Sequence, residues 1–330
     1  MTRQTPVRVV HLDPDGFEDL TTERKLFEAA FESVAFAAVD TGGAAIADDV
    51  EAADVLLTHY ATVPAEAMDA VDPSVVACYA TGVDNVDVEA ATERGIAVTN
   101  VPEYCDDEVG EHIVTLALAL LRGLPAYDAQ TARAEWDWGA VSPVRTGAGL
   151  TFGFFAFGRK ARAAAERAGA FGFDVVAHDP YLPDDEIRAA GAEPVSFDEL
   201  VEESEVLSLN APLTPETDGR FDETVFSRMP AEAVLVNTAR GRLVDEADLV
   251  DALDSGSLHG AGLDVLATEP PDGDNPLLDR PDTVVTPHAA WFSEGAVDRV
   301  RTRGTKVASA ALRGEAVDGV VNPDAFGNRS

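Results

Sequence analysis

Short apolar runs rich in β-branched residues alternate along the chain with amphipathic segments of helix length. This alternation is typical of a doubly wound parallel sheet, because strands that are buried on both faces need helices to cover them. The runs that predict strands fall into two series. The first comprises Val7–Leu12, Val55–Thr58, Val75–Tyr79 and Ile96–Thr99, and the second comprises Leu150–Phe155, Asp174–His178, Val206–Leu209, Val234–Asn237, Gly262–Val265 and Thr283–Val285. The sequence therefore predicts an α/β protein with two parallel sheets.

Two long helical patterns suggest how these sheets are divided between domains. Residues 108–121 place apolar side chains at positions 109, 113, 116 and 120, which lie on one face of a helix. The break between the sheets falls near residue 101, before this helix, and a second helical pattern over 295–312 follows the last strand. We expect that last helix to return to the first domain. The predicted domains are a discontinuous one, residues 1–101 plus 292–330, and an inserted one, residues 102–291.

The charge balance is unusual for a folded protein. The 330 residues carry 60 Asp and Glu against 24 Lys and Arg, a formal net charge of -36, and the acidic residues are spread over the whole length. Nucleic acid is an unsuitable partner for such a chain. We interpret the pattern as a halophilic surface, because molar salt shortens the Debye length to about 3 Å and suppresses self-repulsion. A generic acidic protein is the alternative.

The two cysteines, Cys78 and Cys105, neither form a disulfide framework nor have metal-ligand spacing, so we expect a reduced, intracellular protein without a metal. The N-terminus has no apolar signal-peptide core, and the longest apolar stretch, residues 113–121, is about half of a membrane span. We therefore predict a cytoplasmic protein with no membrane partner.

A dinucleotide-binding pattern occupies residues 149–180, which read as strand, turn, helix and second strand ending in an acid. The turn is Ala156-Phe157-Gly158-Arg159-Lys160-Ala161, in which Gly158 is the glycine needed for close approach to a pyrophosphate. Ala156 is a departure, because a methyl group would crowd the tight turn. Asp179 lies 21 residues after Gly158, as expected for an acid that binds a ribose 2′-hydroxyl and repels a 2′-phosphate. The prediction is an NAD site, and the alternative is a βαβ unit that binds nothing.

Three later segments place polar residues directly after an apolar strand, where α/β sheets bind ligands. Arg240 is a cation suited to a carboxylate, His288 a proton donor near neutral pH, and Glu269 an acid able to hold an imidazole. Taken singly, each has a simpler interpretation: a surface ion pair, a capping histidine and a solvated turn residue. We interpret the other histidines as structural or exposed, with His259 in a loop.

These segments resemble the D-isomer-specific 2-hydroxyacid dehydrogenase family over about residues 50–312, through NTARG, DVLATEP and TPH. The resemblance implies a Rossmann cofactor domain inserted into a flavodoxin-like substrate domain, and a catalytic trio of Arg240, Glu269 and His288. The stretches NVPEYC, GFDVVAHDPYL and TPHAAWFSEGA are most similar to the C-terminal-binding-protein branch. Formate dehydrogenases, which are relatives, also begin their turn with alanine but pair the histidine with glutamine. The cofactor contacts expected from the motif and the resemblance are Thr81, Phe157, Gly158, Arg159, Lys160, Asp179, Ala211, Thr217, Thr238, Ala239 and Asp264.

The substrate loop of the family resembles R-x-G-x-G-x-D-N, and here the segment is CYATGVDN. Cys78 replaces the arginine and Ala80 the first glycine, so one cation for a second anionic group is missing. The expected substrate contacts are Ala80, Thr81, Gly82 and Trp291, the last as an apolar wall. We therefore expect a monocarboxylic 2-keto acid with a small or apolar side chain.

The predicted function is reversible, NAD-dependent reduction of a small 2-keto acid to a D-2-hydroxy acid. Two alternatives stay open. A non-catalytic NAD-sensing scaffold of corepressor type fits the losses at 78, 80 and 156, although the catalytic trio argues against it. Phosphoglycerate dehydrogenase is disfavoured by Cys78 and by a chain too short for a regulatory domain. By resemblance we expect a homodimer formed through the cofactor domains, with helix 103–121 at the interface.

Overall fold

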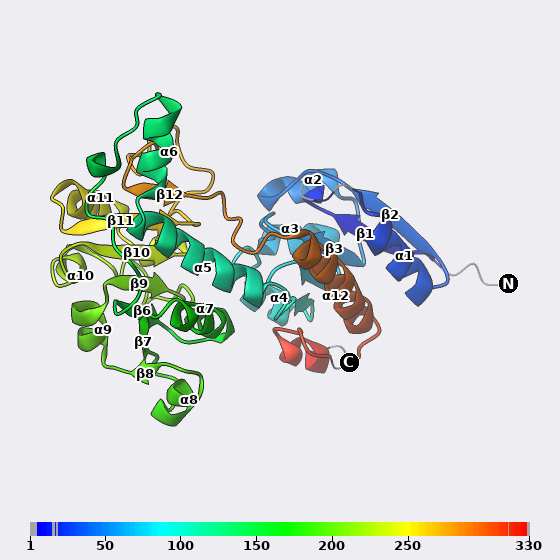
Figure 1. Cartoon of the computed structure of the whole chain (residues 1–330). Coiled ribbons are helices and arrows are strands. Elements are labelled where there is room, and N and C mark those ends of the chain that lie inside the picture. The colour runs from blue at the N-terminus through cyan, green and yellow to red at the C-terminus, as the bar shows by residue number, and fades with distance from the viewer. Residues whose placement is uncertain (1–4, 15–16, 18, 316, 329–330) are drawn as a thin grey trace. The chain divides into compact units, whose positions relative to one another are not determined.

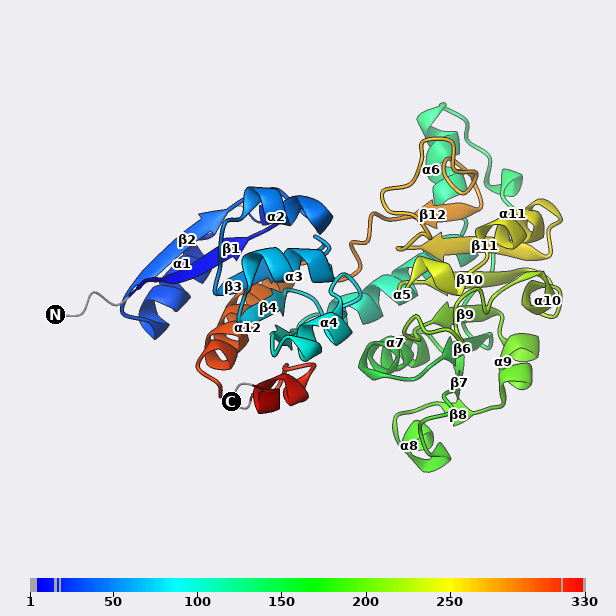
Figure 2. The ribbon, with the colours of Figure 1, turned by 180° about the vertical axis from the view of Figure 1, so that it is seen from behind.

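The computed structural model describes residues 5–14, 17, 19–315 and 317–328. The chain forms two compact units, which Figures 1 and 2 show from opposite sides. Unit 1 combines Met1–Tyr104 with Ser293–Ser330, and unit 2 is Cys105–Phe292.

Unit 1 is built on a five-stranded sheet in the order β2-β1-β3-β4-β5, and every pair in it is parallel. This is the flavodoxin-like order. Its strands are β1 (Val7–His11), β2 (Val34–Ala38), β3 (Val55–Thr58), β4 (Val75–Cys78) and β5 (Ala97–Thr99). Its helices are α1 (Thr21–Ala30), α2 (Ile46–Asp49), α3 (Ala65–Val71), α4 (Val88–Glu93) and α12 (Glu294–Leu312), with 3₁₀ turns η2 (Gly43–Ala45) and η5 (Pro323–Asn328).

The expected return of the last helix is confirmed, because α12 packs against α1, β4 and β5. Strand β2 was not predicted. It is an edge strand with no fully buried residue, and three of its five residues are alanines, Ala35, Ala37 and Ala38, so it lacks the continuous β-branched run that marks a central strand.

Unit 2 contains a seven-stranded parallel sheet in the order β12-β11-β10-β9-β6-β7-β8. Its strands are β6 (Thr151–Phe155), β7 (Asp174–His178), β8 (Glu193–Pro194), β9 (Val206–Leu209), β10 (Ala233–Asn237), β11 (Leu258–Leu263) and β12 (Thr283–Val285). Its helices are α5 (Asp106–Leu121), α6 (Leu124–Ala132), α7 (Arg159–Ala170), α8 (Asp184–Ala189), α9 (Phe197–Glu203), α10 (Glu223–Phe226) and α11 (Glu246–Asp254), with η3 (Trp138–Ala140) and η4 (Gly241–Leu243). The two predicted parallel sheets are therefore confirmed.

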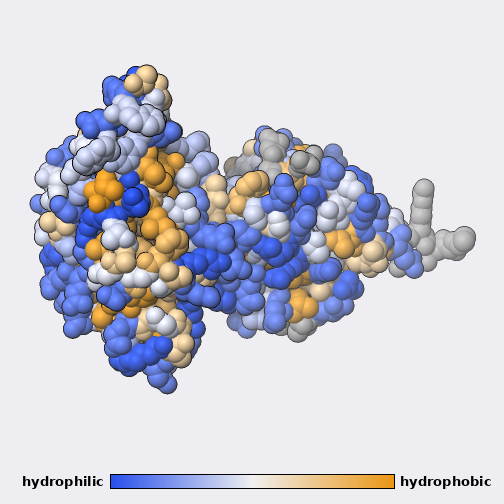
Figure 3. Space-filling model, in the orientation of Figure 1, coloured by the Kyte–Doolittle hydropathy of each residue, from blue (hydrophilic) through white to orange (hydrophobic). Residues whose placement is uncertain are grey.

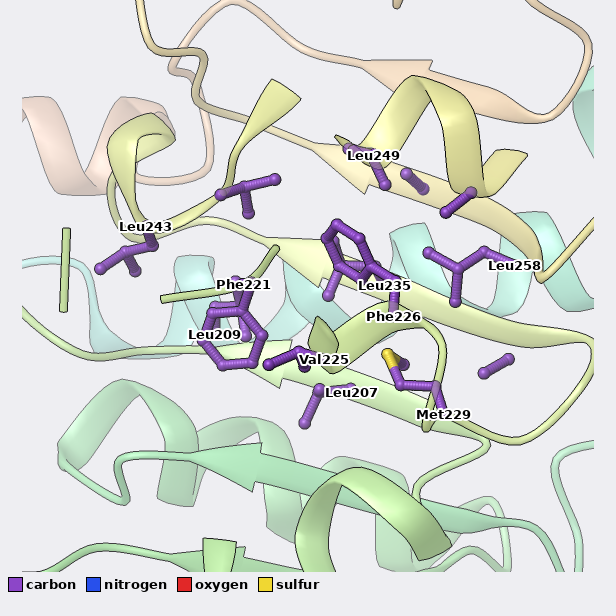
Figure 4. Packing of buried hydrophobic residues seen from close by; sticks show 14 of the residues in the cluster. Leu207, Leu209, Phe221, Val225, Phe226, Met229, Leu235, Leu243, Leu249 and Leu258 are labelled. Atoms are coloured by element: carbon purple, nitrogen blue, oxygen red, sulfur yellow. The ribbon is translucent and has the colours of Figure 1, made fainter. Parts of the chain in front are cut away.

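Buried apolar side chains from β9, β10, β11 and the helices over them form the main core of unit 2. Figure 4 shows Leu207, Leu235 and Leu258 on the strands facing Phe226 and Leu249 on the covering helices. On the other face, the predicted apolar positions of α5 at 109, 113, 116 and 120 are all buried. Helix α5 also approaches α7 closely, since a Cβ added at Gly110 would lie 2.8 Å from the Cβ of Ala163. The sheet is thus covered on both faces.

Three details of the second sheet differ from prediction. The two-residue edge strand β8, Glu193–Pro194, was not predicted. Strand β11 begins at Leu258 and ends at Leu263, so it starts earlier than the predicted Gly262–Val265, and His259 lies in this strand instead of a loop. The Gly-Ala-Gly composition of residues 260–262 hides the strand, because glycine is depleted in strands. Here a Cβ at Gly262 would lie 2.8 Å from the Cβ of Leu116 on α5, so close packing requires the glycine.

Among the described residues, no single helix is long and apolar enough to cross a membrane. Helices α5 and α6 meet the criteria of length and composition only as a pair, across a bend of 63°.

A buried polar cluster lies beneath the carboxyl ends of β1 and β4 in unit 1. Arg301 of α12 donates to both carboxylate oxygens of Glu23 on α1, at 2.6 and 2.8 Å. His11 packs edge-on against Phe17 and Tyr79, and neither of its ring nitrogens has a hydrogen-bond partner. Burial, with a smaller contribution from the positive charge of Arg301, lowers the pKa of His11 to about 4. The imidazole is therefore neutral at pH 7.

We predict that His11→Phe, which keeps a flat ring, makes the free energy of unfolding less sensitive to acid. The ordinary pKa of histidine is 6.5, so between about 4 and 6.5 the unfolded chain binds the proton that folded His11 rejects. Wild-type stability therefore falls as pH drops through this window, by about 3 kcal/mol from this residue. Urea unfolding at several pH values measures the difference. Parallel pH curves for the two proteins would contradict the assignment.

Candidate active site and cofactor pocket

The cofactor pocket lies where the strand order of unit 2 reverses, at the carboxyl ends of β6, β7 and β9. Such a switch point is where open α/β sheets bind ligands. A cavity of about 960 Å³ is lined there by Ala156 after β6, Asp179 after β7 and Ala211 after β9. Thr217 also lines it, in a turn held by a hydrogen bond from Thr217 Oγ1 to the carbonyl of Pro212, at 2.7 Å.

The turn after β6 has the geometry that a glycine usually provides. Ala156 has a φ of 64°, in the left-handed region, and its amide donates to the carbonyl of His178 at 2.9 Å. The cost of alanine at this position is therefore conformational, about 1–2 kcal/mol. Asp179 holds the same turn, because its two carboxylate oxygens accept the amides of Phe157 and Tyr181, each at 2.9 Å. Its carboxylate is thus oriented at the pocket wall.

The residues at the start of α7 suit a phosphate group. Gly158 lines the cavity, and a Cβ added to it would meet no other protein atom within 4 Å, so the absent side chain leaves room on the ligand side. The first amides of α7 are not bonded within the helix, and this end of a helix favours an anion. Arg159 and Lys160 line the same cavity. The set of groups fits a dinucleotide pyrophosphate.

Two of the expected cofactor contacts also have partners within the protein. The side chain of Phe157 is fully buried and packs on Phe154, with ring centroids 5.8 Å apart, so only its backbone belongs to the turn. Lys160 Nζ, expected at the pyrophosphate or in solvent, lies 3.4 Å from Asp106 Oδ1 on α5. Thr238 and Ala239 follow β10 and are half-buried, and they belong to the other half of this sheet edge.

The structure brings His288 and Glu269 together. Nδ1 of His288 lies 2.7 Å from Oε2 of Glu269, and the side chains are 33% and 36% exposed. Burial acts to raise the pKa of Glu269, but the hydrogen bond and charge of His288, the amide of Leu266 and the charge of Arg240 together hold it below its usual range. The carboxylate is therefore ionised and orients the imidazole with Nε2 directed away from it.

Arg240 lies beside this pair because of its neighbouring glycine. Gly241 packs so closely on the following loop that a Cβ would lie 1.9 Å from the carbonyl carbon of Leu266. The backbone amide of Leu266 in turn donates a hydrogen bond to Glu269 Oε1, at 2.9 Å. The carbonyl of Arg240 accepts the side-chain amide of Asn237, at 2.8 Å. Gly241 was not predicted to position Arg240, although it directly follows the arginine in the NTARG segment.

Asp264 is buried and holds the loop that carries His288. Its carboxylate accepts the Thr286 hydroxyl at 2.5 Å and the amides of Ala289 and Ala290 at 2.8 and 2.9 Å. His288 has a φ of 51°, a left-handed conformation that its amide stabilises by donating to the carbonyl of Asp264 at 2.8 Å. Asp264 is one of the expected cofactor contacts, and the structure shows that its carboxylate also holds this loop.

His112 links α5 to the same loop, since its Nε2 lies 2.9 Å from the Thr286 hydroxyl. Burial lowers the pKa of His112, and the charge of Asp264 opposes this only in part. The sequence contains no local signal for this contact, because the two residues lie 174 positions apart.

The expected substrate loop follows β4 in unit 1. Ala80, Thr81 and Gly82 are half-buried, and the carbonyl of Thr81 accepts the side-chain amide of Asn100 at 2.7 Å. Cys78 is buried below them, and burial, with the nearby charges of Asp13 and Asp84, raises the pKa of its thiol to about 12. This position therefore carries no charge at neutral pH.

Trp291 lies three residues after His288, in the loop that follows β12 in unit 2. It is half-buried and packs edge-on against Phe292, with ring centroids 5.6 Å apart. Unit 2 thus brings together Arg240, Glu269, His288 and Asp264, and separately Gly158, Arg159, Lys160, Asp179, Ala211 and Thr217. The loop at 80–82 belongs to the other unit.

Comparison with known proteins shows which proteins this chain resembles. The chain is 40% identical over 275 residues to D-3-phosphoglycerate dehydrogenase of Mycobacterium bovis, covering 83% of this chain and 52% of that protein. It therefore spans about half the length of the first curated relatives it matches. It is 34% identical to hydroxypyruvate reductase of Blautia hydrogenotrophica, over 82% of this chain and 85% of that protein. The crystal structure of NAD-dependent formate dehydrogenase from Staphylococcus aureus in complex with NAD superposes with a TM-score of 0.84 at 29% identity, covering 94% and 97% of the two chains.

The model of the D-isomer specific 2-hydroxyacid dehydrogenase NAD-binding domain matches residues 114–290, more than half of the chain. This match contains Arg240, Glu269 and His288 together with the cofactor pocket except Asp106. The chain therefore belongs to the D-isomer specific 2-hydroxyacid dehydrogenase family.

Proposed function

We propose that the protein catalyses reversible hydride transfer between NADH and a small 2-keto acid, forming a D-2-hydroxy acid. The observation that carries this proposal is the 2.7 Å contact between His288 and an ionised Glu269, with Arg240 beside them. These residues follow β12, β11 and β10, at the same edge of the sheet as the cofactor pocket. A hydride donor and a proton donor could therefore act along one edge.

In this proposal each polar group has one task. Arg240 binds the substrate carboxylate and polarises the keto oxygen, because guanidinium is suited to planar oxygen pairs. His288 donates a proton from Nε2 to that oxygen, and Glu269 stabilises the positive charge of the imidazolium before transfer. The keto acid gains one hydride and one proton, and the product alcohol leaves with both.

Bound NADH would supply the hydride, and the residues at the start of α7 fit its phosphates. Gly158 leaves room for a close approach, Arg159 and Lys160 supply positive charge, and Asp179 would accept the ribose hydroxyl. Thr238, Ala239, Ala211 and Thr217 are proposed to contact the remainder of the cofactor, with Thr81 contributing from unit 1. The proposed domain roles follow: residues 102–291 bind the cofactor, and residues 1–101 with 292–330 bind substrate.

The substrate class follows from what the site lacks. The neutral, buried thiol of Cys78 supplies no cation for a second anionic group. Trp291 is proposed to present an apolar surface to the substrate side chain. A monocarboxylic acid such as pyruvate, 2-ketobutyrate or hydroxypyruvate fits better than a dicarboxylic one.

Phosphoglycerate dehydrogenase is a second candidate, favoured by the names of relatives that are 40% identical. It requires cations for a phosphate that the Cys78 position does not provide. A non-catalytic scaffold is disfavoured because the His288–Glu269 pair is complete. Reduction of 3-phosphohydroxypyruvate and hydroxypyruvate, compared in one NADH oxidation assay, distinguishes the first two activities, and no oxidation with any 2-keto acid would favour the scaffold.

We predict that His288→Ala and Arg240→Ala each lower kcat for keto-acid reduction by roughly 10²- to 10⁴-fold, because a positioned proton donor or carboxylate anchor is lost. Glu269→Gln keeps a hydrogen-bond acceptor but loses the charge, so its loss should be smaller. Absorbance of NADH with a 2-keto acid panel measures the rates.

Two controls accompany these variants. Arg240→Lys keeps the charge but not the planar fork, and should recover only part of the activity. NADH affinity and melting temperature should stay near wild type in all four proteins. Near wild-type turnover in His288→Ala or Arg240→Ala would refute the catalytic assignment.

We predict that Asp179→Ser raises the efficiency with NADPH relative to NADH by about tenfold or more. A carboxylate fixed by two backbone amides would face the 2′-phosphate, and serine removes that repulsion. The measurement is kcat/KM with each cofactor. Asp185→Asn is the matched control, since it changes the charge by the same amount on an exposed residue outside the pocket. An unchanged cofactor ratio in Asp179→Ser would reject this role.

We further propose a halophilic, cytoplasmic homodimer. The net charge of -36 supports salt adaptation, and two buried free cysteines support a reducing compartment.

The charge balance of residues 122–145 differs from that of the rest of the chain, because this segment contains three arginines and three carboxylates and so has no net charge. Trp136 and Trp138 in this segment are 92% and 88% exposed, an unusual state for large apolar rings. Figure 3 also shows apolar surface over the middle of unit 2, where Figure 1 places α5.

Two measurements test these proposals, a salt series for salt adaptation and sedimentation equilibrium for the dimer. Between about 0.1 and 2 M KCl the melting temperature should rise, because screening weakens repulsion between carboxylates.

Sedimentation equilibrium should show a dimer, and the double variant Trp136→Ser with Trp138→Ser should convert that dimer to a monomer. Phe171→Ser, another exposed apolar residue of unit 2, is the control and should stay dimeric. A flat or falling melting curve contradicts salt adaptation, and a monomeric wild type contradicts the dimer.

A further inference from the structure

Asp106, in the first turn of α5, lies in the wall of the cofactor pocket. Its Oδ2 accepts a hydrogen bond from Arg159 Nε at 3.1 Å, and its Oδ1 lies 3.4 Å from Lys160 Nζ. The Asp106 side chain is 21% exposed, and its Oδ1 is buried without a hydrogen bond. One carboxylate from α5 therefore pairs with the first two cations of α7, Arg159 and Lys160.

Close packing of α5 against α7 stabilises the pairing of Asp106 with Arg159 and Lys160. Gly110 allows α5 to approach α7 within van der Waals contact, one turn after Asp106. Asp107, the next residue, pairs on the outside with Arg167 of α7, at 2.9 Å. The backbone of Asp106 is thus held in place, and its carboxylate stays near the phosphate end of the pocket.

A carboxylate at this position opposes phosphate binding. A pyrophosphate group is anionic, and it would meet Arg159 and Lys160 already partly neutralised by Asp106. Like charges within a few Å repel by about 1 kcal/mol in water and by more near a protein surface. The positive end of α7 remains available, so binding is weakened and not abolished.

We propose that Asp106 is an internal competitor for the cofactor phosphates, a residue that sets NADH affinity through Arg159 and Lys160. This inference rests on the proposed function, since it assumes that the pocket binds a dinucleotide. Asp106 lowers affinity at low salt, and the penalty shrinks as salt screens the repulsion.

The experiment compares wild type with Asp106→Asn by titration calorimetry, using ADP, adenosine and NADH as probes. At about 0.1 M KCl, the substitution should lower the Kd of ADP and NADH by five- to tenfold, and at about 1 M by less than twofold. The Kd of adenosine, which carries no phosphate, should not change. Asp107→Asn is the matched control: it alters charge by the same amount on the same helix, outside the pocket, and should leave all three Kd values near wild type.

A double-mutant cycle with Lys160→Gln tests whether Asp106 acts through this cation. In the wild-type background Lys160→Gln should weaken ADP binding by less than threefold, because Asp106 already offsets the charge. In the Asp106→Asn background the same change should weaken it by at least fivefold. Melting temperatures of all variants confirm that each is folded.

The possible outcomes separate two failures. If wild type binds NADH and Asp106→Asn leaves its Kd unchanged or raises it, the competitor role is wrong while the proposed function stands. If neither protein binds NADH, ADP or adenosine, the proposed function fails and takes this inference with it.

Discussion

The buried carboxylate of Asp264 determines where the candidate catalytic pair lies. It directly follows β11 and accepts three hydrogen bonds from the loop after β12, so His288 is held in a left-handed backbone conformation facing Glu269. A buried amide left without its acceptor costs about 1–3 kcal/mol, and two amides and a hydroxyl depend on this one carboxylate. The geometry of His288, the candidate proton donor, therefore depends on Asp264.

Close backbone approaches complete this arrangement. The absent side chain at Gly241 lets the loop after β10 rest on residue 266, which carries Arg240 towards Glu269. On the opposite face of the sheet, Gly262 allows Leu116 of α5 to pack against β11. The sheet edge that carries the candidate trio is thus supported from both faces by contacts that any larger residue would break.

Cations are few in this chain, whose net charge is -36, and three of those at the cofactor pocket are paired with carboxylates. Arg159 and Lys160 share Asp106, and Arg162 pairs with Glu186 at 2.7 Å at the pocket wall. Any anionic ligand must therefore compete with carboxylates that already contact these cations. Exposed pairs of this kind contribute little to stability, but they set the local charge that a ligand meets.

The sequence by itself determined the α/β class, the two parallel sheets and most strand positions, and it singled out the candidate trio of Arg240, Glu269 and His288. These features depend on local periodicity and on polar residues directly after strands, so they are visible without knowing which elements pack together. Only the tertiary structure decided that Lys160 pairs with Asp106, that Asp264 holds the loop of His288, and that His11 is buried neutral. Edge strand β2 and the start of the glycine-rich strand β11 could not be predicted from the local sequence pattern either, because pairing with neighbouring strands determines them. Contacts between residues tens of positions apart depend on how closely two elements approach, and that distance is set by packing at sites such as Gly110 and Gly262.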